Sequence, residues 1–142
     1  MITTPPEITP VSTPEAPAPA GHYAQALAFG DLIFVSGQLA ARVDGTHAAH
    51  EPFEVQTRIV LANAFAILRA VGSSPERVLK VTAFIVGVEH WPTFNRIYAE
   101  VFGDWRPARS VVPVPELHHG YLVEVEVIAA RSPEMPKITE HR

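Results

Sequence analysis

The stretch YLVEVEVIA, residues 121–129, decides the fold because its side chains alternate between two kinds. Successive side chains of a β-strand point to opposite faces of a sheet. One face holds Tyr121, Val123, Val125 and Val127, and the other holds Leu122, Glu124, Glu126 and Ile128. We expect the first face to pack under helices. The second mixes carboxylates with large apolar groups, which is typical of a half-buried cleft or a subunit interface.

The run RSVVPV at residues 109–114 predicts another strand just before this one. A short segment with Pro115 and Gly120 joins the two runs. Pro113 lacks the N–H that a sheet ladder needs, so we expect an edge strand or a bulge at this position.

If the two runs pair as a hairpin, the simplest register places Arg109 near Glu126 and Val111 near Glu124. Arg109 would then share the face of the carboxylates. Two interpretations stay open at this point. Either the guanidinium and a glutamate form a structural ion pair, or they form a pocket in which Arg109 holds a substrate carboxylate and one glutamate moves protons.

The segment upstream predicts a hairpin and a helix. Residues 22–39, HYAQALAFGDLIFVSGQL, combine β-forming runs with a turn signal at Gly30 and Asp31. Residues 53–71 carry apolar side chains at helical spacing and stop at Gly72. We therefore expect a β-hairpin followed by an amphipathic helix.

The middle of the chain predicts a buried strand and a shorter helix. Residues 78–88, VLKVTAFIVGV, are rich in β-branched side chains. Pro92 suits a first helical position, and Gly103 ends the apolar stripe that follows it. The resulting order, β-β-α-β-α-β-β, has two helices, which are too few to cover both faces of a sheet. One face is therefore left over.

The composition is that of one small globular domain, with 142 residues, 47% apolar and 18% charged. No apolar run approaches the roughly 20 residues that cross a bilayer. The net charge of −4, with basic residues scattered singly, argues against nucleic acid as a primary partner. The chain has no cysteine and no visible secretory leader, so we expect a cytoplasmic protein without disulfides.

Three segments are expected along the chain. Six of the 14 prolines lie in the first 20 residues, which predicts a flexible, extended N-terminal arm over residues 1–20. The folded domain should span residues 21–131. Residues 132–142 are polar and punctuated by proline, so we expect a C-terminal tail.

Four blocks of sequence match a known family in order and spacing. They are HYAQAL followed by IFVSGQL, QTRIVLANAFAILRAVGSS, VLKVTAFIVGVEHWPTFNRIYAEVFG with its Asn-x-x-Tyr spacing, and PARSVVPVPELHHGYLVEVEVIA. Over residues 21–131 the chain resembles the RidA (YjgF) family of reactive-intermediate or imine deaminases, whose members are also described as endoribonuclease L-PSP-like. The resemblance implies a chorismate-mutase-like α+β fold, with one mixed sheet, two helices on one face, and a homotrimer with clefts between neighbouring subunits.

The resemblance also implies a site and an activity. Arg109 would bind the substrate carboxylate, Glu124 would position or activate the hydrolytic water, and Tyr23, Ser36 and Asn95 would line the cleft. The implied reaction is hydrolysis of 2-imino or 2-enamino acids to 2-oxo acids and ammonia, without metal or organic cofactor. Val111 departs from the pattern, because active family members commonly carry Cys there, and this residue would also line the pocket.

Other interpretations remain open. The substrate could be a specialised pathway intermediate such as an aminomuconate-like acid, or the protein could be a non-catalytic trimer that binds small molecules or other proteins. The acidic balance gives no support to the ribonuclease or translation-inhibitor roles described for some relatives. His118 and His119 are adjacent, but their side chains diverge and no third ligand of suitable spacing is visible, which argues against a metal site.

Overall fold

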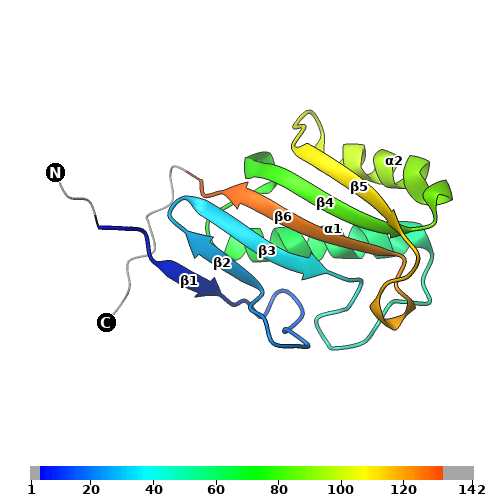
Figure 1. The fold of residues 1–142 in the computed structure, drawn as a ribbon, viewed down its shortest axis with the longest axis horizontal. Coiled ribbons are helices and arrows are strands. Elements are labelled where there is room, and N and C mark those ends of the chain that lie inside the picture. Colours follow the sequence, from blue (N-terminus) through cyan, green and yellow to red (C-terminus); the bar gives the residue numbers. More distant parts are fainter. Residues whose placement is uncertain (1–3, 133–142) are drawn as a thin grey trace.

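The computed structural model describes residues 4–132, which form an α+β fold around one mixed six-stranded sheet (Figure 1). The elements are β1 (Ile8–Val11), β2 (Ala26–Phe29), β3 (Leu32–Gln38), α1 (Phe53–Ala70), β4 (Val78–Val86), α2 (Trp91–Phe102), β5 (Ala108–Val114) and β6 (Val123–Ala130). The strand order is β1-β2-β3-β6-β4-β5, in which only β4 and β5 run parallel. None of the helices in residues 4–132 has the length and apolar content to span a membrane.

The predicted elements are confirmed. The β2–β3 hairpin turns at Gly30, whose φ of 60° is a left-handed conformation that glycine adopts at little cost. The helices α1 and α2 and the buried strand β4 lie where the sequence patterns predict them. Pro113 lies in β5, which is an edge strand, where a missing backbone donor disturbs no second ladder.

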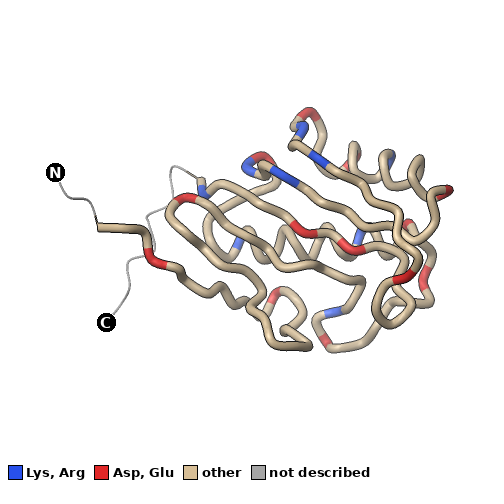
Figure 2. Tube along the Cα trace, viewed as in Figure 1, with Lys and Arg blue, Asp and Glu red and all other residues tan. Residues whose placement is uncertain are grey.

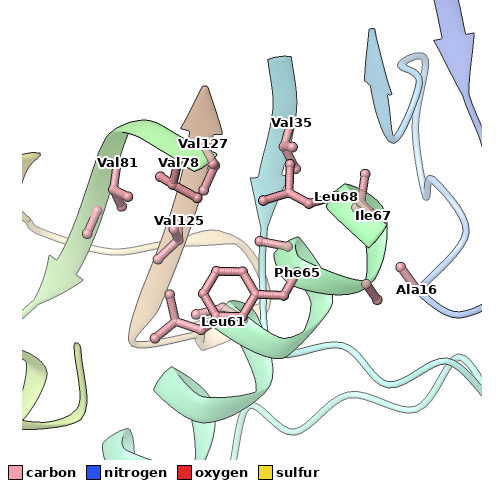
Figure 3. Close-up of a cluster of buried hydrophobic side chains, with 14 of the residues drawn as sticks. Ala16, Val35, Leu61, Phe65, Ile67, Leu68, Val78, Val81, Val125 and Val127 are labelled. Atoms are coloured by element: carbon pink, nitrogen blue, oxygen red, sulfur yellow. The ribbon is translucent and has the colours of Figure 1, made fainter. Parts of the chain in front are cut away.

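The alternating strand forms the centre of the sheet. β6 lies between β3 and β4, and the exposed fractions of Val123, Val125 and Val127 on its apolar face are between 0 and 2%. Figure 3 shows Leu61 and Phe65 of α1 packed toward this face. Burial of such side chains stabilises the fold by about 1.5–3 kcal/mol each, so this face determines which side of the sheet the helices cover.

The hairpin predicted between residues 109–114 and 121–129 is wrong. β4 lies between β5 and β6 and pairs with both. The reason is the helix α2, which carries the chain back over the sheet so that β5 can join β4 in parallel, as crossover connections do. The strand with Pro113 then takes the edge, while the apolar β6 takes the centre.

This pairing places Arg109 and Glu124 on opposite faces of the sheet. Arg109 is the partner of Val81, whose side chain is fully buried on the helix side. Glu124 is the partner of Phe84, which lies three residues along β4 and therefore points to the other face. The expectation that Arg109 shares the carboxylate face is thus wrong within one chain.

The face away from the helices stays open in the single chain. Its β2 and β3 section presents large apolar side chains with exposed fractions between 37 and 42%: Leu27, Phe29, Leu32 and Phe34. A contiguous exposed apolar patch of this kind marks an interaction surface in a folded protein. The sequence predicts such an uncovered face, because two helices are too few to cover both sides of the sheet.

The N-terminal arm is folded over part of its length, so the expected boundary at residue 21 is wrong. β1 pairs antiparallel with β2, and Val11 and Ala16 are buried in the core. Prolines are tolerated here because β1 is an edge strand. The expected tail at 132–142 lies, except for Ser132, outside the described residues.

The buried side chain of Gln25 fastens the arm to the domain. Its Oε1 accepts a hydrogen bond from the Thr13 backbone N at 2.7 Å, and its Nε2 donates to the carbonyl oxygens of Thr13, Ala16 and Pro17 at 2.9–3.3 Å. One amide side chain therefore satisfies several backbone groups that no strand pairs. The exposed fraction of Gln25 is 3%, so these groups have little access to water.

We expect Gln25→Leu to lower the free energy of unfolding by about 2 kcal/mol, because it leaves a buried N–H and three carbonyl oxygens without a partner. Urea unfolding at a fixed chain concentration measures this loss. Limited proteolysis should at the same time become faster within residues 12–20. An unchanged unfolding midpoint and cleavage rate would show that the arm does not depend on this clamp.

Candidate functional site

A pocket of about 500 Å³ brings together three of the predicted site residues. Tyr23, Ser36 and Glu124 all line it, together with the Pro17 to Gly21 part of the arm. Two further lining residues, His47 and Tyr121, come from the loop after β3 and the segment just before β6. The pocket thus lies where the arm, the end of β3 and the beginning of β6 meet.

A bulge in β3 shapes the floor of this pocket. The pairing of β3 with β6 shifts register between Val35 and Gln38, which frees Ser36 and Gly37 from the regular ladder. The Ser36 hydroxyl donates to the Ala24 carbonyl oxygen at 2.6 Å, which holds the bulge against the preceding loop.

Gly37 makes room for the carboxylate of Glu124. A Cβ atom at this position would lie 2.6 Å from Glu124 Oε2, so any other residue would displace that oxygen. Gly37 is not among the residues that the sequence assigns to the site. The sequence feature that could have identified it is the Ser-Gly-Gln block at 36–38, because a glycine lets another side chain come close to the backbone.

The environment of Glu124 favours its protonated form. Burial raises the pKa of this carboxyl, and the negative charge of Glu126 on the same face of β6 raises it further. Within residues 4–132 Glu124 makes no ion pair that would offset these effects. A carboxylate with a raised pKa accepts a proton more readily near neutral pH than an ordinary one.

Tyr23 lies at the mouth of the pocket, with an exposed fraction of 51%. Its hydroxyl oxygen accepts a hydrogen bond from the Ala20 backbone N at 3.3 Å. The hydroxyl hydrogen has no acceptor in the described part of the chain, so it is available to a ligand.

Aromatic side chains that the sequence does not assign to the site form one wall of the pocket. His47 hydrogen-bonds the hydroxyl of Tyr121, and His118 and His119 lie beside it. The adjacent pair is visible in the sequence, but His47 is 71 residues away from it, and only the fold brings them together. No cluster of three or more metal-ligating side chains occurs within residues 4–132.

A second hollow, of about 360 Å³, holds the other two predicted polar residues. Asn95 and Arg109 line it with Tyr98, between α2 and the start of β5. The Arg109 guanidinium lies over the rings of Tyr98 and Phe94, with its carbon 4.8 and 5.7 Å from their centroids. Such stacking holds the planar group in one orientation.

Two polar side chains of this hollow, Arg109 and Tyr98, lack hydrogen-bond partners in the described part of the chain. Arg109 makes no hydrogen bond or ion pair there, although a guanidinium has five N–H donors. The Tyr98 hydroxyl is buried without a hydrogen-bond partner, and burial raises its pKa to about 12. An oriented guanidinium with free donors suits a bidentate carboxylate ligand.

The two hollows remain separate within one chain. β4 stands between the strands that carry Arg109 and Glu124, and the two side chains point to opposite faces. Val111 lines neither hollow in this chain, because its partner Ala83 lies on the helix side and Val111 packs against the core. One chain therefore holds two incomplete sets of polar groups.

Comparison with known proteins places the chain among relatives of similar length. The sequence model of the family described as endoribonuclease L-PSP matches residues 13–131. A 2-iminobutanoate/2-iminopropanoate deaminase of Dermatophagoides farinae is 35% identical over 118 residues, which cover 83% of this chain and 92% of that protein.

Solved structures share the fold as well as the sequence. The crystal structure of E. coli TdcF with bound serine aligns with a TM-score of 0.82 and 32% identity, over 87% of this chain and 99% of the other. A member of the conserved Rid protein family from Yersinia pestis, YyfA, aligns with a TM-score of 0.84 and 37% identity, over the same shares of the two chains.

We expect Glu126→Gln to lower the pKa of Glu124, because removal of a neighbouring negative charge favours the ionised form. The pKa should stay above the ordinary value of a glutamate carboxyl, since burial remains the larger cause of the shift. Carboxyl ¹³C NMR titration measures it. Glu116→Gln, at an exposed position outside the pocket, should leave it unchanged. An unchanged or raised pKa in Glu126→Gln would contradict this account of the electrostatics.

Proposed function

The chain belongs to the endoribonuclease L-PSP family, also called RidA or YjgF, and we propose that it hydrolyses 2-imino and 2-enamino acids at clefts between the subunits of a homotrimer. The products are a 2-oxo acid and ammonia. The observation that carries the proposal is the separation of Arg109 and Glu124 in one chain, each lining a hollow in which its charged group makes no ion pair within residues 4–132.

A second copy of the chain would complete both half-sites. The hollow with Glu124 opens beside the uncovered sheet face, whose apolar patch needs a partner. The hollow with Arg109 lies at the β5 edge of the sheet. A head-to-tail contact that sets the edge of one subunit against the open face of the next closes into a ring, and a trimer has three such contacts.

Arg109 is the group that orients the substrate. Its guanidinium, held over Tyr98 and Phe94, binds the carboxylate of the imino acid through two parallel hydrogen bonds. Asn95 of the same subunit, with Tyr23 and Ser36 of its neighbour, lines the cleft around the reacting carbon. A protonated imine is already a strong electrophile, so orientation supplies much of what the reaction needs.

Glu124 is the group that moves protons. It accepts a proton from a water molecule as the water oxygen bonds to C2 of the protonated imine, and it then donates this proton to the nitrogen. As the C–N bond breaks, Glu124 takes the proton of the C2 hydroxyl, which becomes the 2-oxo group, and passes it to the departing ammonia. General acid–base catalysis of this kind contributes about 10²–10⁴-fold to the rate. The raised pKa of Glu124 suits both steps, because the group must gain and lose the same proton.

Rival functions have less support. Lys and Arg are scattered among Asp and Glu along the chain in Figure 2, and the net charge is −4, which does not favour RNA as a substrate. E. coli TdcF is solved with bound serine, an amino acid that shares its carboxylate with the 2-imino acids that we propose. A non-catalytic binding trimer would not need a carboxylate with a raised pKa beside an oriented guanidinium.

We expect Arg109→Ala to lower kcat/KM for imine hydrolysis by about 100-fold or more, because the carboxylate clamp is lost. Glu124→Gln should keep substrate binding and lower kcat by about 10²–10⁴-fold. An amino-acid oxidase generates the imine in situ, and the protein's activity is the suppression of semicarbazone formation. Arg69→Ala, at an exposed position on α1, is the matched control and should retain wild-type activity.

Circular dichroism and the mass of the assembly separate a catalytic role from a structural one. Both should match the wild type in all three variants. Unchanged turnover in Arg109→Ala would contradict the clamp, and loss of the assembly in Glu124→Gln would show that Glu124 has a structural role.

A further inference from the structure

The pocket that holds Glu124 is larger than a small imino acid requires. Its volume of about 500 Å³ lies within the range of pockets that enclose drug-sized ligands, roughly 300–1,000 Å³. A three-carbon substrate would leave most of this space to water. The side chains that surround the remaining space therefore indicate what the rest of the substrate is.

Three imidazoles and one phenol form a continuous aromatic wall in that space, made of His47, His118, His119 and Tyr121. The ring centroids of His118 and His119 are 3.7 Å apart, and those of His119 and His47 are 4.6 Å apart. His47 is fixed in turn by its hydrogen bond to Tyr121, whose exposed fraction is only 1%. The wall is thus anchored to the core at one end and open to the pocket at the other.

His119 has an unusual backbone conformation at the middle of the wall. Its φ of 59° is the only positive φ of a non-glycine residue within residues 4–132. Residues in this region are costly to hold and tend to occur at functional sites. Gly120, with φ of 77°, follows directly, so the turn that presents the imidazole is built from two left-handed residues.

The charges around the pocket distinguish between classes of large side chain. Glu124 is the one carboxylate that lines the pocket, and no lysine or arginine lines it. Burial lowers the pKa of His119, and the nearby His118 and His47 lower it further, so the site favours the neutral form of this ring. A second carboxylate on the substrate would meet Glu124 without a cation to offset the repulsion. An uncharged, planar side chain meets ring faces instead.

Resting on the proposed function, we propose that the substrate is a 2-imino or 2-enamino acid with an aromatic side chain, which stacks on the wall of His47, His118, His119 and Tyr121. The side chain would extend from C2, beside Glu124, across the pocket to His119. The wall then selects the substrate, while Arg109 and Glu124 carry out the reaction common to all imino acids.

The test compares imines that differ only in the side chain. D-amino-acid oxidase produces them from D-alanine, D-phenylalanine and D-cyclohexylalanine, and the α carbon loses its handedness on oxidation. Cyclohexylalanine matches phenylalanine in size but not in planarity. We expect kcat/KM to be about 10-fold higher for the phenylalanine imine than for either of the others, as ring stacking contributes to binding beyond the area that it buries.

The matched variants are His119→Asn and His50→Asn. Asparagine tolerates positive φ, so His119→Asn removes the ring and keeps the turn. It should reduce the preference for the phenylalanine imine over the alanine imine by about 3- to 10-fold. His50 is exposed and lies outside the pocket, so His50→Asn should keep the wild-type preference.

The outcomes separate this inference from the proposed function. Hydrolysis of all three imines at equal rates would overturn the aromatic wall and leave the deaminase in place. A preference for the dicarboxylic imine of D-glutamate, generated by D-aspartate oxidase, would overturn it in favour of an anionic substrate. Hydrolysis of none of the imines would overturn both.

Discussion

Strand β4 pairs in parallel with β5 and antiparallel with β6, and this arrangement decides where Arg109 and Glu124 lie. It sets Arg109 on the helix side of the sheet and Glu124 on the open side. Aromatic rings orient the guanidinium of Arg109. Burial raises the pKa of Glu124, whose carboxylate lies against Gly37. Neither can reach the other within one chain, so a shared substrate requires a second subunit.

The open sheet face links the fold to this requirement. A sheet with two helices on one side leaves its other side apolar and exposed, and a neighbouring copy would bury that surface. Burial of this apolar face would then both drive assembly and form the catalytic cleft. The contact that removes the apolar patch from water would also limit the access of water to the cleft, where charge interactions would become stronger. The arm held by Gln25 contributes a further wall to the same pocket.

The sequence predicts individual helices and strands better than it predicts which strands pair in the sheet. Alternation in residues 121–129 and helical spacing in 53–71 define elements and buried faces, because both follow from a short stretch of chain. The hairpin with Arg109 fails because the partner of a strand is decided by a crossover helix and by competition for the sheet centre. Likewise, His47 joins His119 only through tertiary structure. The prediction that residues 1–20 form a flexible arm fails because part of this segment is an edge strand, and an edge strand tolerates proline.

Hybrid assemblies test most directly whether Arg109 and Glu124 act from different subunits. Arg109→Ala and Glu124→Gln chains, each inactive alone, are mixed in equal amounts, unfolded and refolded together. If each site takes Arg109 from one subunit and Glu124 from the next, random mixing in a trimer restores about a quarter of the wild-type sites. We predict that fraction of the wild-type imine hydrolysis. A mixture that stays as inactive as its components would contradict the shared site.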